Sequence, residues 1–377
     1  MPHTTALPIV ATPEALRQLI DNASQQTVLA LDTEFFWERT YYPVLGIIQL
    51  GWSAEESYLI DAVALTDLTP LAVLLNNPRI CKILHDAPQD LTIIERATAA
   101  TPRNIFDTRL AAGFTGRSAT LSLANLLAEL LDVHLAKTET RTDWLHRPLS
   151  VKQVDYALDD IRYLPALRQK LEEEVKQRGH GDKLQQELSR LDDLSYNHQP
   201  DTSHLFLKIK GAQQLTPAAL AVLRQLAIWR DSEARRLDIP RRHLISDDRL
   251  LQLAAEQPQE AAAIAQIIDN NRRHLHHADE ALLELIAKAQ NEPASAWPTP
   301  QTIPESAVRQ RVKTLTAALA SHCQSLGIDP MLVANRSELT HLVENRSSST
   351  RLHDNSWRTP IINSLLHTIG PAANAKE

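Results

Sequence analysis

The sequence predicts an α/β domain followed by two small all-helical domains, and three observations favour this fold class. Short runs of Val, Ile and Leu alternate with helix-like stretches as far as residue 115. From Leu121 onward, apolar residues recur at helical spacing. Polar breaks containing proline, at 195–204 and 291–306, divide the remainder of the chain. The predicted domains are 1–204, 205–292 and 293–377.

The first domain opens with segments that are typical of strands. Three apolar runs lie between residues 27 and 61, and Gly, Pro or polar residues separate them. Two further runs, at 79–84 and 104–108, alternate with helical-looking stretches. This alternation indicates a sheet that is flanked by helices. The helical-looking stretches cover 67–76, 87–98 and 108–115.

Helices are expected throughout the rest of the chain. A long helix is predicted over 150–194, where Ser150 and Gln153 form a capping-box pattern. Pro165 should bend this helix or split it in two. The two later segments share an outline of a long helix, a short connector and a capped second helix, which suggests a divergent internal duplication.

Composition excludes several classes of protein. The chain has 377 residues, 43% hydrophobic and 23% charged, which is typical of a soluble globular protein with more than one core. It shows no signal peptide and no run of about 18 apolar residues, so we expect a cytoplasmic protein without a membrane partner. We also expect a monomer. Cys81 and Cys323 lack the spacing of a zinc site. The net charge of −7 argues against a basic coat for nucleic acid, although 201–250 is more basic and could meet phosphates.

Asp32 and Glu34 lie two residues apart at the end of the apolar run 28–31. In a strand, this spacing points both side chains to the same face. Two neighbouring carboxylates repel each other, and a hard cation such as Mg²⁺ or Mn²⁺ between them relieves the repulsion. The alternative is that both acids simply face solvent. Their place at a strand end, where α/β sheets usually carry their sites, favours the metal.

A second acidic segment, at 85–90, follows the apolar run 79–84 and enters a predicted helix. It contains Asp86 and Asp90. Either acid could cap the helix or hold a metal, and a cap or a solvated charge is the commoner use of an isolated acid. The residues alone therefore leave this choice open.

A third acidic segment lies in the helix predicted over 150–194. Tyr156 and Asp160 are four residues apart, so the phenol and the carboxylate share one helix face. Asp159 is offset by a similar angle on the other side. Helical geometry therefore does not choose between the two acids.

These segments carry a family resemblance. LALDTEF, HDAPQD and YALDDIRYL, in this order, resemble the three motifs of the DEDD exonuclease superfamily, and the tyrosine marks its DEDDy branch. The stretch 28–167 is similar to bacterial ribonuclease D, and the helical segments resemble HRDC modules. The resemblance implies a ribonuclease H-like mixed sheet flanked by helices, followed by two small all-α HRDC-like domains.

The resemblance also implies roles for individual residues. It selects Asp90 over Asp86 and Asp160 over Asp159, and it makes Tyr156 the residue that orients the attacking water. Asp159 departs from the pattern as an additional acid beside a ligand position. The implied ligands of two divalent cations, Mg²⁺ or Mn²⁺, are Asp32, Glu34, Asp90 and Asp160.

The activity that the resemblance implies is two-metal-ion hydrolysis by a 3′→5′ exoribonuclease, which releases 5′-mononucleotides from a free 3′ end. The expected substrate is RNA, and the family likeness implies trimming of the 3′ ends of tRNA precursors. A DNA-directed 3′→5′ exonuclease is one alternative, since nothing at the metal site reads a 2′-hydroxyl. A catalytically silent scaffold that binds nucleic acid is another.

Substrate contacts are predicted on weaker grounds. Aromatic residues after the first motif could stack terminal bases, and cations in 137–144 could meet phosphate. Each of these residues could equally pack in the protein. The basic residues of 208–242 could contact nucleic acid or lie on solvated helix faces. The substrate-binding candidates are Phe35, Tyr41, His85, Lys137, Arg141 and Trp144.

Overall fold

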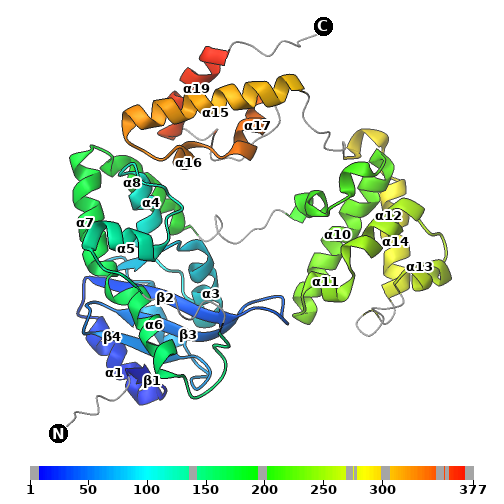
Figure 1. Cartoon of the computed structure of the whole chain (residues 1–377). Coiled ribbons are helices and arrows are strands. Elements are labelled where there is room, and N and C mark those ends of the chain that lie inside the picture. The colour runs from blue at the N-terminus through cyan, green and yellow to red at the C-terminus, as the bar shows by residue number, and fades with distance from the viewer. Residues whose placement is uncertain are drawn as a thin grey trace. The chain divides into compact units, whose positions relative to one another are not determined.

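The computed structural model divides the chain into two compact units, and each is described by itself (Figure 1). Unit 1 comprises Met1–Phe36, Leu45–His198 and Pro304–Glu377. Unit 2 comprises Trp37–Val44 and Gln199–Ile303. The structure describes residues 8–135, 142–193, 202–268, 275, 278–298, 306–344, 352 and 356–369.

Unit 1 contains a six-stranded mixed sheet of order β1-β4-β3-β2-β5-β6. β1 and β4 are parallel, β3 and β4 are antiparallel, and β2, β5 and β6 run parallel to one another. The five predicted strands are present, and a short sixth strand, β1, was not predicted because it has only two residues. The bounds are β1 (Ile9–Val10), β2 (Val28–Phe36), β3 (Val44–Gly51), β4 (Ser57–Asp61), β5 (Cys81–Leu84) and β6 (Ile105–Asp107).

Helices cover both faces of this sheet (Figure 1). Leu29 and Leu31 of β2 are buried on one face, beside Ile94 of α3. On the opposite face, α6 packs against β2 and β4. The expected effect of Pro165 is present, since α6 ends at Arg162 and α7 begins two residues later. The helices are α1 (Pro13–Ala23), α2 (Ala72–Leu75), α3 (Pro88–Thr98), α4 (Thr108–Gly113), α5 (Leu123–Leu131), α6 (Val151–Arg162), α7 (Leu164–Gln177) and α8 (Gly181–Leu191), with a 3-10 turn η1 (Thr69–Leu71).

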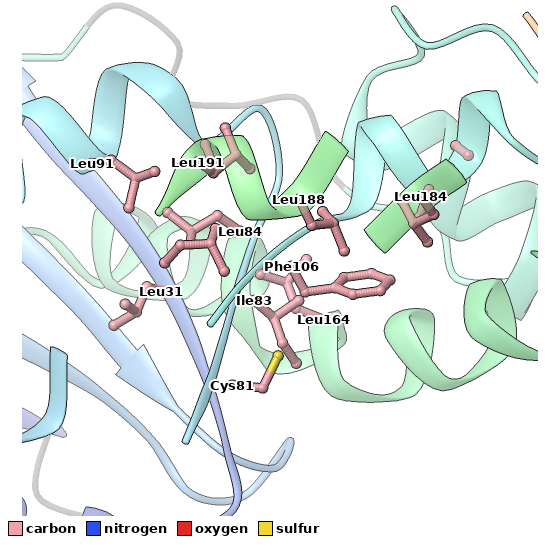
Figure 2. Close-up of a cluster of buried hydrophobic side chains, with 14 of the residues drawn as sticks. Leu31, Cys81, Ile83, Leu84, Leu91, Phe106, Leu164, Leu184, Leu188 and Leu191 are labelled. Atoms are coloured by element: carbon pink, nitrogen blue, oxygen red, sulfur yellow. The ribbon is translucent and has the colours of Figure 1, made fainter. Parts of the chain in front are cut away.

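The core of unit 1 is continuous from the sheet into α7 and α8. Figure 2 shows apolar side chains of β5 and β6 gathered against leucines of these two helices. This burial holds β5, whose carboxyl end leads into α3, in a fixed position. The labelled side chains are Leu31, Cys81, Ile83, Leu84, Leu91, Phe106, Leu164, Leu184, Leu188 and Leu191.

The C-terminal helices belong to the same hydrophobic core as the sheet. Leu332 lies against Gly113 of α4, and the Asp329 carboxylate accepts a hydrogen bond from the backbone N–H of Ala119. The segment predicted as a separate helical domain therefore packs within unit 1, and its buried apolar residues are part of the core of the sheet. The boundaries 1–204, 205–292 and 293–377 stay a prediction. The helices are α15 (Ser306–Leu326), α16 (Pro330–Val333), α17 (Arg336–Val343) and α19 (Arg358–Ile369).

Unit 2 is a helical module with a hydrophobic core of its own. Its long helix α10 contacts η2, α12 and α14, so it forms the centre of the module. Across the parts of the chain that the structure describes, no helix is both long enough and apolar enough to cross a membrane. The elements are η2 (Thr202–Lys208), η3 (Ala212–Gln214), α10 (Pro217–Leu237), α11 (Arg241–Leu244), α12 (Asp247–Glu256), α13 (Ala261–Ile267), α14 (Ala278–Gln290) and η5 (Ala294–Ala296).

Candidate active site

The first pair of acids lies on β2, in the interior of the sheet. Because side chains alternate along a strand, Leu31 and Thr33 point to the face covered by α3, and Asp32 and Glu34 point to the opposite face. This is the face against which α6 packs. The two acids therefore extend from a rigid central strand beneath a helix.

Asp90 comes from the first turn of α3 and is only 8% exposed. The unpaired N–H groups at a helix N-terminus favour a negative charge there. The Thr33 hydroxyl on β2 donates a hydrogen bond to Asp90 Oδ1. The Asp107 carboxylate accepts hydrogen bonds from the backbone N–H groups of Asp86, at 3.3 Å, and Ala87, at 2.9 Å. These contacts fix both the chain entering α3 and the carboxylate itself.

Tyr156 and Asp160 lie on α6, and their side chains hydrogen-bond to each other. Asp159 instead forms an ion pair with Arg162, with Oδ1 and Nη1 3.1 Å apart. The two neighbouring acids, which helical geometry did not separate, thus face different partners. Asp160 is among the charges that raise the pKa of Asp32, whereas the charge of Asp159 raises the pKa of Asp160.

The pKa of each of the four acids is raised, and their charges meet at Asp32. Burial is the main cause at each, and at Asp32 it is joined by the charges of Asp90, Asp160 and Glu34, so that its pKa lies well above the usual range. Burial and the charges of Asp160 and Asp90 raise the pKa of Glu34 to about 9. Burial, with the charges of Asp159 and Asp90, raises the pKa of Asp160 to about 7. Burial, with the charges of Asp86 and Asp107, raises the pKa of Asp90 to about 6. Three separate elements therefore bring four mutually repelling carboxyls into one region.

This set of donors fits hard divalent cations. All four groups offer carboxylate oxygens, and a dication would relieve the repulsion that raises their pKa values. Among the residues that the structure describes, no group of three or more His, Cys, Asp or Glu side chains is arranged so that it could hold a metal ion. The fit therefore rests on the chemistry of the oxygens and on their shared electrostatic field.

Tyr156 is a neutral phenol at this site. Burial and the charges of Asp160, Glu34 and Asp32 raise the pKa of its hydroxyl. The ring of Trp144 lies 6.1 Å from the Tyr156 ring, centroid to centroid. A neutral hydroxyl held in this way is a hydrogen-bonding group for a water or a substrate oxygen and not a base.

Two of the predicted substrate contacts, His85 and Trp144, interact with other parts of unit 1. His85 Nε2 donates to the carbonyl oxygen of Leu121 at 3.1 Å, and Nδ1 lies 2.8 Å from the Thr108 hydroxyl. Burial and the nearby Arg109 lower the pKa of His85 to about 4, so its ring is neutral and both nitrogens have protein partners. Trp144 is only 4% exposed. His85 is thus held by partners within the protein and Trp144 is buried, so neither is proposed as a substrate contact.

Tyr41, another predicted substrate contact, lies in unit 2. Its hydroxyl donates to Asp231 Oδ1 at 2.7 Å and accepts from Arg235 Nε at 2.9 Å and Arg241 Nη2 at 2.8 Å. The two guanidinium groups lie 5.5 and 5.0 Å from its ring centroid. Asp238 Oδ1 accepts from the Tyr41 backbone N–H at 3.1 Å. The Tyr41 hydroxyl and ring both interact with side chains of unit 2, so Tyr41 is not proposed as a substrate contact.

Phe35 is half-buried at the end of β2, beside Glu34, and Lys137 and Arg141 lie outside the described residues. In unit 2, most of the basic side chains that were candidates for nucleic-acid contact have acidic partners. This favours a structural role for them. The pairs are Arg224 with Glu292, Arg230 with Asp247, Arg235 and Arg241 with Asp231, and Arg236 with Glu233.

Sequence reasoning missed two residues that hold the site together. Thr33 lies between Asp32 and Glu34, but its partner Asp90 is 57 positions away, so no local sequence pattern predicts the contact. Asp107 is the last residue of β6, within the predicted run 104–108, and an acid at a strand end was its only signal in the sequence.

A mixed sheet flanked by helices, with acids from β2, α3 and α6 in one electrostatic field, is the arrangement of a hydrolytic 3′-5′ exonuclease domain. The 3′-5′ exonuclease family matches residues 7–176, and the HRDC domain matches residues 219–293. Exonucleases of this type depend on divalent metal, and an HRDC domain indicates a nucleic-acid substrate. The predicted α/β exonuclease domain, followed by a helical HRDC domain and a mostly helical C-terminus, is thereby confirmed.

Comparison with known proteins identifies the family. Ribonuclease D of Desulfotalea psychrophila is 39% identical over 356 residues, which cover 93% of this chain and 95% of that protein. Ribonuclease D of Escherichia coli is 31% identical over 337 residues, or 89% of each chain. The crystal structure of Escherichia coli RNase D, an exoribonuclease involved in structured RNA processing, matches with a TM-score of 0.80 at 29% identity and covers 96% of this chain and 97% of that chain. The chain belongs to the ribonuclease D family and is a hydrolytic 3′-5′ exoribonuclease.

Proposed function

We propose that Asp32, Glu34, Asp90 and Asp160 hold two divalent cations, Mg²⁺ or Mn²⁺, and that Tyr156 orients the attacking water. The observation that carries this proposal is the raised pKa of the buried Asp32, to which the charges of Asp90, Asp160 and Glu34 all contribute, since buried carboxyls that repel one another are stabilised by bound dications. Divalent cations at such a site lower the pKa of water and offset the charge on the departing oxygen.

The proposed substrate is RNA with a free 3′ end, in particular the 3′ extensions of tRNA precursors, and the proposed products are 5′-mononucleotides. Two observations support this: the ribonuclease D relatives match almost end to end, and the solved relative acts on structured RNA. Phe35, which follows Glu34 on β2, is proposed as a contact for the terminal base. We further propose that the protein acts as a cytoplasmic monomer.

A comparison of three substrates tests the proposal. The full chain with Mg²⁺ or Mn²⁺ would be given a tRNA with extra 3′ nucleotides, a linear RNA and a single-stranded DNA, each labelled at its 5′ end. We expect the extended tRNA to be shortened fastest, one nucleotide at a time. Fastest cleavage of DNA would favour the DNA-directed alternative, and metal-dependent binding without cleavage would favour a silent scaffold.

Tyr156→Phe is expected to lower kcat by about a hundredfold, because a water that is no longer held in place loses the advantage of orientation. The concentration of Mg²⁺ that gives half-maximal activity should change little, since the phenol is not a proposed ligand. Single-turnover cleavage of labelled RNA at several Mg²⁺ concentrations measures both quantities. Tyr163→Phe, at the end of the same helix, is the matched control and should behave as wild type. A loss in the variant that excess Mg²⁺ restores would contradict the positioning role.

The stability of the cation-free protein should depend on pH through Glu34. Its pKa is raised from 4.5 to about 9, so the folded state prefers the neutral acid. The stability that this preference contributes is complete below about pH 4.5 and is lost as the pH rises toward 9. We therefore expect the melting temperature of wild type in EDTA to fall relative to that of Glu34→Gln between pH 6 and 9.

Adding Mg²⁺ should reverse this trend in wild type, because the ionised carboxyls are the form that binds cations. Thermal unfolding of both proteins, with EDTA or Mg²⁺, across this pH range measures the difference. If the melting temperatures of wild type and Glu34→Gln in EDTA changed with pH in the same way, Glu34 would have an ordinary pKa.

A further inference from the structure

Thr33 occupies an unusual place beside the proposed metal ligands. It stands between Asp32 and Glu34 on β2, yet the pleat of the strand turns its side chain to the opposite face, against α3. There it is only 5% exposed. Among the three polar residues of the first motif, it is therefore the one that faces the helix carrying Asp90.

The Thr33 hydroxyl uses this position to donate a hydrogen bond to Asp90 Oδ1. Asp90 is itself buried, so its carboxylate has little water to orient it. A hydrogen bond from a neutral hydroxyl to a buried carboxylate is among the stronger contacts that a side chain can make. It also joins the two elements, β2 and α3, that supply ligands from the first and second motifs.

We propose that Thr33 is a positioning residue, which holds the Asp90 carboxylate in the orientation that binds a divalent cation. The proposal rests on the proposed function, since it assumes that Asp90 is a ligand. Partners of this kind fix the direction of a ligand's lone pairs before the cation arrives, and replacing them commonly weakens metal affinity about tenfold to a hundredfold. Thr33 itself touches neither cation nor substrate.

Substitutions at Thr33 separate the hydrogen bond from the packing. Thr33→Val keeps the shape and removes the donor, whereas Thr33→Ser keeps the donor and removes a methyl group. Thr98→Val is a matched control, because the Thr98 hydroxyl is equally buried near the end of α3 and donates to the Ile94 carbonyl oxygen at 2.7 Å, away from the acids. Asp90→Asn and the double variant Thr33→Val/Asp90→Asn complete the set.

Calorimetric titration of the full chain with Mn²⁺ alone, without RNA, provides the test. We expect Thr33→Val to weaken Mn²⁺ binding about tenfold, Thr33→Ser to stay within about twofold of wild type, and Thr98→Val to bind as wild type. In the Asp90→Asn background, Thr33→Val should cause no further loss, because its effect passes through Asp90. Melting temperatures recorded alongside verify folding, and Thr33→Ala replaces Thr33→Val if the latter does not fold.

Two outcomes would overturn the positioning role while leaving the proposed function intact. One is wild-type Mn²⁺ affinity in Thr33→Val together with weakened binding in Asp90→Asn. The other is an equal loss from Thr33→Val with and without Asp90. By contrast, wild-type affinity in Asp90→Asn would remove Asp90 from the proposed ligand set, and the role of Thr33 would fail with it.

Discussion

Asp32→Asn is expected to lower kcat/KM on 3′-extended RNA by about a thousandfold or more. Asp32 interacts with all three other acids, so its loss disturbs the whole proposed cation site and not one edge of it. Charge stabilisation by metal ions contributes several kcal/mol to such reactions, and each 1.36 kcal/mol corresponds to a factor of ten in rate. Cleavage of labelled RNA under single-turnover conditions with saturating Mg²⁺ measures the effect.

Asp159→Asn is the matched control for this experiment. Asp159 is also an acid close to the site, but its partner is Arg162, and we expect the variant to keep nearly normal activity. Near-normal cleavage by Asp32→Asn would refute the proposed ligand set. Equal losses in both variants would show that the site responds to its net charge and not to the placement of ligands.

Arg358→Met is expected to destabilise unit 1 by about 3 to 5 kcal/mol, which is the usual cost of leaving one member of a buried ion pair without its partner. The Arg358 and Glu187 side chains are 1% and 6% exposed and form a two-pronged ion pair between α19 and α8. Arg358 Nε also donates to the Leu332 carbonyl oxygen at 2.7 Å. The Trp357 indole N–H donates to Glu187 Oε1 at 2.8 Å. Removing the guanidinium leaves a buried carboxylate with most of its donors gone.

Urea unfolding measures this effect, and limited proteolysis shows whether the C-terminal helices detach first. Arg236→Met is a suitable control, because the Arg236–Glu233 pair is exposed and should contribute nothing measurable. The double variant Arg358→Met/Glu187→Leu should recover part of the lost stability, since it removes both buried charges. A stability of Arg358→Met equal to that of the control would mean that the apolar core alone holds the C-terminal helices in place.

Tertiary contacts decided several features that the sequence left open. Asp159 and Asp160 were equivalent by helical geometry, and only the Arg162 ion pair on one side and the Tyr156 hydrogen bond on the other distinguish them. The sequence made Tyr41 a candidate for base stacking, whereas in the structure its hydroxyl bonds to side chains of α10 and α11. In each case the deciding contact depends on which side chains the fold brings together.

The sequence by itself determined five of the six strands, the helical character of the chain from Leu121 onward, the break at Pro165 and the order of the three acidic motifs, but not the second break between α7 and α8. These features follow from local rules, because strand and helix periodicity, capping residues and prolines act within a few positions along the chain. Only the tertiary structure decided that the C-terminal helices share the core of the sheet and that Thr33 holds Asp90. An apolar stripe or a lone hydroxyl indicates that a partner is needed, and the packing of elements distant in sequence determines which partner it is.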